Sequence, residues 1–166
     1  MTKGLPAAVL TGALAAASLL HAQARPDFSG TWTMDLARSE STRQGEPIKP
    51  PVTVIIAQTA ADVRVETTRG DQKETVVYPL GDSRRAAAAA IGSSFQPEAF
   101  WDGDKLVTQT QRQVQGYAVT VKEVRSLASD GREMIMETAV IVQHGYTMPG
   151  VKNYGTARDV FTRLDR

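Results

Sequence analysis

Residues 117–143 read YAVTVKEVRSLASDGREMIMETAVIVQ, and this stretch decides the fold class. Every second residue of its first half falls on one face of an extended strand: Tyr117, Val119, Val121, Glu123 and Arg125. Asp130-Gly131 then supplies a tight turn before a second, largely apolar run. An Asp-Gly turn between two such runs is among the stronger short-range signals of a β-hairpin. The stretch therefore predicts two long antiparallel strands, over 117–127 and 133–143.

The same strand and turn signals recur on both sides of this hairpin. Further strands are predicted over 28–35, 52–56, 62–67, 73–78, 99–101, 105–112 and 159–164. Residues 79–97, with five consecutive alanines, and residues 145–155, marked by glycine and proline, are predicted to be loops. We therefore expect an all-β, antiparallel up-and-down meander of about 8–9 strands. Without helices to cover a face, such a sheet curls or closes into a barrel.

The first 24 residues have the pattern of a cleaved signal peptide. Lys3 provides the positive start, the apolar stretch runs from Leu5 to Leu20, and Ala22-Gln23-Ala24 matches the small-x-small cleavage site. The apolar stretch is short for a membrane span, which needs roughly 20 residues. We therefore expect a signal peptide over 1–24, a mature domain over 25–166, no stable membrane insertion, and a periplasmic or secreted location.

Composition excludes several classes of function. Lys and Arg number 19 against 18 Asp and Glu, and Lys3 leaves with the signal, so the mature domain is nearly neutral. This balance does not favour nucleic acid or an anionic membrane as partner. The chain has no cysteine, and His144 is the one histidine of the mature domain. Neither a metal site nor a cofactor is expected, because no calcium-loop spacing and no glycine-rich phosphate loop is present.

Residues 28–32, FSGTW, resemble the Gly-x-Trp signature on the first strand of lipocalins and related calycin barrels. The wider layout resembles small secreted lipocalin-like proteins of bacteria, with matches at 28–39, 101–106 and 123–131. The Thr-Asp-Tyr-type second motif of kernel lipocalins is missing. The resemblance implies a barrel whose base is closed by Trp32. It also implies a basic residue stacked on that ring, for which Arg163 is the first choice and Arg158 the second.

Two groups of residues are candidates for contacts with a ligand. Tyr117, Glu123 and Arg125 share a strand face, which either points into a cavity, where Glu123 and Arg125 would pair, or turns to solvent. His144, Tyr146, Tyr154 and Arg158 cluster around the predicted loop 145–155. They either line one mouth of the barrel, a common place for ligands, or belong to a loop that merely covers its end.

Three functions remain open. The first is a lipocalin-like binding protein for a small, at least partly apolar molecule. The second is an envelope protein-interaction domain with a solid barrel, for which an exposed Phe100 or Trp101 would speak. The third is an enzyme on a calycin-like barrel that uses His144, or Glu123 with Arg125. Met134 and Met136 are expected in the core under all three.

Overall fold

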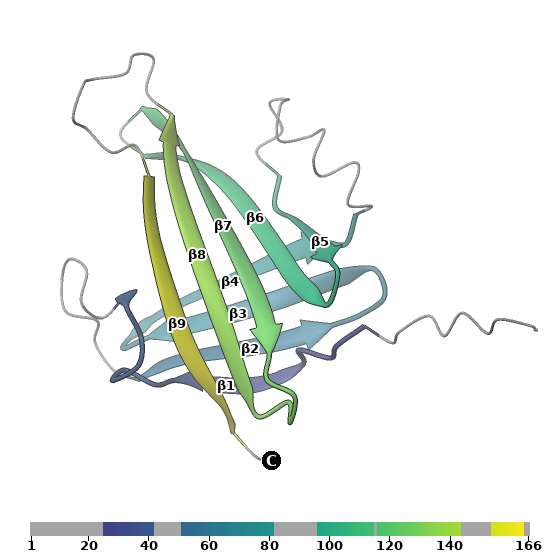
Figure 1. Cartoon of the computed structure of the whole chain (residues 1–166). Helices are drawn as coiled ribbons and strands as arrows, with labels where there is room; N and C mark the ends of the chain where they lie inside the picture. The colour runs from purple at the N-terminus through teal and green to yellow at the C-terminus, as the bar shows by residue number, and fades with distance from the viewer. Residues whose placement is uncertain (1–24, 42–50, 82–95, 115, 144–153, 165–166) are drawn as a thin grey trace, which may run out of the picture.

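The computed structural model in Figure 1 describes residues 25–41, 51–81, 96–114, 116–143 and 154–164. The predicted signal peptide, most of the predicted loop 79–97, His144 and Tyr146 lie outside these ranges. Within the described ranges, no helix is long and apolar enough to cross a membrane.

Nine strands form one sheet, and their positions follow the alternation of the sequence. They are β1 (Gly30–Met34), β2 (Val52–Gln58), β3 (Asp62–Arg69), β4 (Gln72–Pro79), β5 (Glu98–Asp102), β6 (Lys105–Val114), β7 (Tyr117–Leu127), β8 (Glu133–Gln143) and β9 (Tyr154–Leu164). Their order in the sheet is β4-β3-β2-β1-β9-β8-β7-β6-β5, and every ladder between neighbours is antiparallel. The predicted all-β meander is therefore confirmed.

The sheet curls until its two edge strands, β4 and β5, nearly meet (Figure 1). A parallel bridge between Leu80 and Ala99 joins them, and the Gly81 N–H donates to the Ala99 carbonyl at 2.8 Å. No longer ladder connects β4 to β5 among the described residues. The result is a barrel that is closed along most of its wall and open along part of one seam.

Strand β9 begins earlier than the sequence pattern predicts. Tyr154 and Arg158, assigned above to the surroundings of a loop, lie inside β9, where they pair with Ile141 and Glu137 of β8. Gly155 suggested a loop, but β8 is long enough to hold these residues in register. The ladder partner therefore outweighs the local preference of glycine for turns.

One end of the barrel is filled by large side chains. Five of them have essentially no exposed surface: Phe28, Trp32, Leu106, Met134 and Phe161. Phe28 also contacts Trp101, with ring centroids 6.1 Å apart, and the indole N–H of Trp32 donates to the Phe28 carbonyl at 2.9 Å. The segment that precedes β1 therefore plugs this end, and Met134 and Met136 are core residues as predicted.

The stack on the buried tryptophan is also present. The Arg163 guanidinium carbon lies 4.5 Å from the centre of the Trp32 ring, and its Nη2 donates to the Asp27 carbonyl at 3.0 Å. Arg163 directly faces Trp32 in the β1–β9 ladder, which puts the two side chains on the same side of the sheet. The contact ties the last strand to the plug by a cation–π interaction and a hydrogen bond.

The chain after β1 keeps following β9. The fully buried Ser39 hydroxyl accepts the Val160 N–H at 3.0 Å, and the Glu40 N–H donates to the Arg158 carbonyl at 2.9 Å. The Ser41 N–H then donates to the Asp159 carboxylate at 3.0 Å. These bonds extend the barrel wall past the end of β1 and bring Ser41 to the interior.

Candidate functional site

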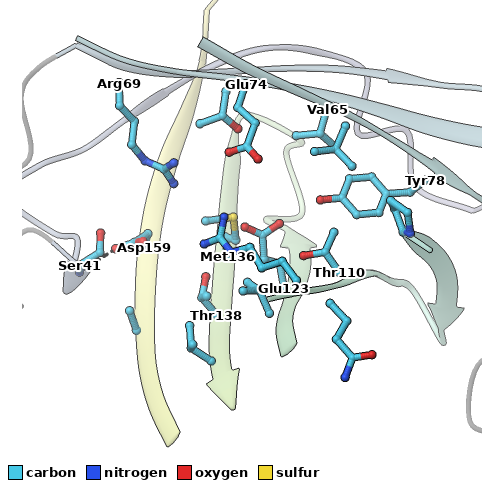
Figure 2. A pocket seen from close by; sticks show the side chains of 18 of the residues that line it. Ser41, Val65, Arg69, Glu74, Tyr78, Thr110, Glu123, Met136, Thr138 and Asp159 are labelled. Atoms are coloured by element: carbon cyan, nitrogen blue, oxygen red, sulfur yellow. Dashed lines mark hydrogen bonds between the residues drawn. The ribbon is translucent and has the colours of Figure 1, made fainter. Parts of the chain in front are cut away.

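A cavity of about 500 Å³ occupies the barrel interior beyond the packed end (Figure 2). One wall is formed by β3 and β4, and the facing wall by β6, β7, β8 and β9. Apolar side chains cover part of both walls: Met34, Val65, Val76, Val121, Met136 and Val140. Polar side chains project between them, so the cavity has a mixed lining.

The strand register fixes the depth of each group on the β7–β9 wall. Met136 faces Arg125 on one side and Asp159 on the other, which defines the deepest row. Glu123 and Thr138 form the next row, and Val121 and Val140 the row nearest the far end. These residues face inward because successive side chains of a strand alternate between its two faces.

Glu123 and Arg125 form an ion pair at the floor of the cavity. The Arg125 side chain is only 1 % exposed, whereas that of Glu123 is 20 % exposed, toward the cavity it lines. Arg125 donates from Nη2 to Oε2 of Glu123 and from Nη1 to the Thr108 hydroxyl at 2.7 Å. The Thr108 hydroxyl in turn donates to Oε2 of Glu123 at 3.2 Å.

This pairing decides the charge of Glu123. Burial acts to raise the pKa of Glu123, but the charge of Arg125 and the hydrogen bonds from Arg125 and Thr108 outweigh it. The pKa of Glu123 is therefore held below its ordinary value, and the group stays ionised at neutral pH. A carboxylate in this state accepts hydrogen bonds and is a poor proton acceptor.

Tyr78 lies against the same network from the opposite wall (Figure 2). Burial and the negative charge of Glu123 raise the pKa of Tyr78 to about 12, although Arg125 and a hydrogen bond with Thr108 act in the other direction. The phenol is consequently neutral over the physiological range and serves as a polar group on an apolar ring.

Asp159 is the second deep carboxylate, and its side-chain environment differs from that of Glu123. The residue is 3 % exposed and accepts the Ser41 N–H at 3.0 Å. No Lys or Arg of the described ranges lies within ion-pair distance of it. The Ser41 hydroxyl beside it is buried and has no hydrogen-bond partner. Both residues line the cavity.

The cavity reaches the open seam between β4 and β6. Thr110 and Arg112 line it from the inner face of β6, and Gln111, whose side chain alternates to the other face, lines it as well. Pro97 and Glu74 border the same region. Strand β5 pairs with β6 only as far as Gln109, and the cavity contacts both faces of β6 beyond that point. Among the described residues, the seam is therefore a lateral opening.

The structure brings only part of the predicted site together. Glu123 lines the cavity, and Arg125 lies directly behind it, so the alternative in which their face points inward is confirmed. Tyr117 and Tyr154 are 37 % and 62 % exposed at the end of the barrel opposite the plug. Arg158 is on the outer surface, in a shallow hollow between β7, β8 and β9, and does not line the cavity.

Sequence reasoning missed Tyr78, Asp159 and Ser41. Asp159 had a detectable signal, since it alternates with Phe161 and Arg163, and Arg163 was already predicted to face the interior. Tyr78 and Ser41 had none, because their inward position depends on how the β3–β4 wall and the segment after β1 fold over the other strands.

Within the described part of the chain, no group of three or more His, Asp or Glu residues is arranged to hold a metal ion. No known protein family matches the sequence, and no curated protein is significantly similar to it.

Proposed function

We propose that this chain is an exported, lipocalin-like binding protein for a small, partly apolar molecule held inside the barrel. The observation that carries the proposal is the cavity of about 500 Å³ in a nearly closed barrel with a lateral opening. Ligand pockets commonly measure roughly 300–1,000 Å³ and combine apolar walls with a few polar groups that fix the orientation of the ligand.

The lining matches that description. Val65, Val76, Val121 and Val140 offer apolar surface on two facing walls, and the ionised Glu123 offers a fixed hydrogen-bond acceptor between them. The pattern of residues 1–24 supports export, and the stack of Arg163 on Trp32 supports a lipocalin-like barrel.

Binding is favoured over catalysis by the state of Glu123. A general base works best with a pKa near the operating pH. Arg125 moves the pKa of Glu123 in the opposite direction, away from neutrality. An interaction domain with a solid barrel is less favoured because the barrel encloses a cavity and Trp101 is buried against Phe28. Phe100, on the edge strand β5, is partly exposed.

The experiment compares two neighbouring substitutions on β8. Val140→Phe adds a ring on the face that lines the cavity, whereas Ile141→Phe adds the same ring on the exposed outer face. Binding is followed by the fluorescence of 1-N-phenylnaphthylamine, an uncharged apolar probe. We expect wild type and Ile141→Phe to bind the probe and Val140→Phe to lose at least about tenfold in affinity, since its ring occupies the space. Equal binding by all three folded proteins would place the probe outside the cavity and contradict the proposal.

A further inference from the structure

The charged residues that line the cavity differ in burial. Two carboxylates, Glu123 and Asp159, lie on the deep wall, while Arg69 of β3, Glu74 of β4 and Arg112 of β6 line the cavity as exposed residues. The buried Arg125 is not part of the lining, and both of its terminal nitrogens already donate, to Glu123 and Thr108. A molecule deep in the cavity therefore meets carboxylate oxygens, and among the described residues those of Asp159 have no Lys or Arg partner.

Asp159 lacks the compensation that Glu123 has. It is almost fully buried and accepts a hydrogen bond from the Ser41 N–H, and no Lys or Arg of the described residues forms an ion pair with it. A buried carboxylate without a cation is costly, because the low-dielectric interior replaces water around the charge. A positively charged ligand group at this position would supply the missing partner. The unpaired Ser41 hydroxyl next to it would accept a further hydrogen bond.

Both carboxylates line the same wall of the cavity. Asp159 lies two strands from Glu123 across the sheet and one register row deeper, with Met136 and Thr138 of β8 between them (Figure 2). Adjacent strands are about 4.8 Å apart and one row is about 7 Å along the strand, so the two backbone positions are roughly 12 Å apart. Both side chains lie on the inner face of the curled sheet and line the same cavity, and Asp159 is held on the Ser41 side of it.

From this arrangement we infer that the ligand is an organic cation, a protonated primary amine on an apolar body, whose ammonium group binds Asp159 on the cavity wall that Glu123 also lines. The inference deepens the proposed function and rests on it. An ammonium group has three donors, which match the free carboxylate oxygens and the Ser41 hydroxyl. The apolar body lies against Val121 and Val140, further from the floor.

A carboxylate ligand, such as a fatty acid, fits this floor poorly. Its head group would lie beside the Asp159 carboxylate, which has no cationic partner in the described chain, and like charges in a poorly solvated site repel strongly. Arg69 and Arg112 are both exposed, and although the charge of Arg69 helps to lower the pKa of Glu123, neither arginine forms an ion pair with Asp159.

The test uses three probes of equal chain length: octylamine, which is protonated at neutral pH, 1-octanol, which is neutral, and octanoate, which is an anion. Calorimetric titration of the mature protein is expected to rank octylamine at least about tenfold above octanol and octanoate last, because charge-assisted hydrogen bonds are worth more than neutral ones. Octanol binding as tightly as octylamine, or octanoate binding more tightly, would overturn the inference while leaving the proposed function intact.

Single substitutions test whether octylamine binds at Asp159. Asp159→Asn keeps an oxygen to accept the Ser41 N–H and removes the charge, so it is expected to lower octylamine affinity about tenfold and leave octanol affinity unchanged. The control Glu137→Gln removes one charge from the outer face of the adjacent strand, β8. It is expected to change neither the octylamine affinity nor the octanol affinity. Ser41→Ala tests the same contact independently: it is expected to lower the octylamine affinity by less than Asp159→Asn does and to leave the octanol affinity unchanged. If Asp159→Asn and Glu137→Gln change the octylamine affinity equally, the ammonium group does not bind at Asp159. If none of the three probes binds wild type, the proposed function fails together with the inference.

Discussion

Replacing Arg125 by methionine is the sharpest test of how the cavity floor is built. Methionine retains an unbranched apolar chain but removes the guanidinium that donates to Glu123 and to the Thr108 hydroxyl at 2.7 Å. The Glu123 carboxylate then remains among buried groups without its cation, held by the Thr108 hydroxyl alone.

The magnitude follows from the burial of the two partners. Removing one member of a buried ion pair costs about 3–5 kcal/mol, because the other charge is left uncompensated. Arg125 is almost completely buried, whereas Glu123 is partly exposed to the cavity, where water can solvate it. We therefore expect Arg125→Met to lower the free energy of unfolding by about 3 kcal/mol, at the lower end of that range.

The assay is urea unfolding of the mature domain at neutral pH, followed by circular dichroism. With a denaturant slope near 2 kcal/mol/M, a loss of ~3 kcal/mol moves the midpoint down by ~1.5 M. The double variant Glu123→Gln/Arg125→Met removes both charges and is expected to regain at least ~1.5 kcal/mol relative to Arg125→Met. A single substitution that costs less than ~1 kcal/mol, or a double variant whose loss equals the sum of both single losses, would refute the account of the pair.

The remaining predictions concern the plug, the segment after β1 and the pH dependence. Arg163→Ala should cost about 1–2 kcal/mol in urea unfolding through loss of its stack on Trp32, with Arg163→Lys in between; equal stability of all three proteins would contradict the stack. Ser39→Ala should cost about 1–3 kcal/mol in thermal unfolding, since a buried β9 N–H loses its acceptor; an unchanged melting temperature would contradict that bond. The depressed pKa of Glu123 contributes stability that is complete above its ordinary value of 4.5 and is lost as the pH falls through the lower folded-state pKa. Glu123→Gln should therefore reduce the fall in the free energy of unfolding as the pH is lowered below 4.5. A fall as steep as that of wild type would argue against a depressed pKa of Glu123. Tyr78 contributes stability that is complete below pH 10.0 and is lost as the pH rises toward about 12. Tyr78→Phe should remove that alkaline loss, which phenolate absorbance can follow, and an unaltered loss would assign it to another group.

The strands could be predicted because their signals are local. Asp130-Gly131 and Gly103, whose φ is positive at 62°, mark tight turns that only a few residue types form readily. Alternation of apolar and polar residues between such turns then fixes each strand. The stacking of Arg163 on Trp32 was predicted through the family resemblance, and the register of β1 against β9 places the two residues opposite each other.

The start of β9 and the composition of the cavity could not be predicted in the same way. Tyr154 belongs to a strand because Ile141 of β8 extends far enough to pair with it, which is a property of the partner strand. The cavity depends on which residues face each other across the curled sheet. Nothing in the local sequence around Tyr78 or Ser41 indicates that each approaches the carboxylates of β7 and β9.

The inward direction of Glu123 and Arg125 was one of two alternatives, because a single bulge reverses every later face assignment along a strand. Strand β7 has an uninterrupted register with β6 and β8 over this stretch, so the alternation set by Val119 and Val121 continues to Arg125. Burial of Arg125 then follows from its pairing with Glu123.

The central claim, a small molecule bound inside the barrel, is tested most directly by mass spectrometry of the mature protein purified from its native source, under native and denaturing conditions. We expect a mass excess that disappears on denaturation in wild type and in Ile141→Phe and is reduced in Val140→Phe, whose ring projects into the cavity. An identical mass under both conditions in wild type, or an equal mass excess in Val140→Phe and Ile141→Phe, would contradict ligand binding inside the barrel.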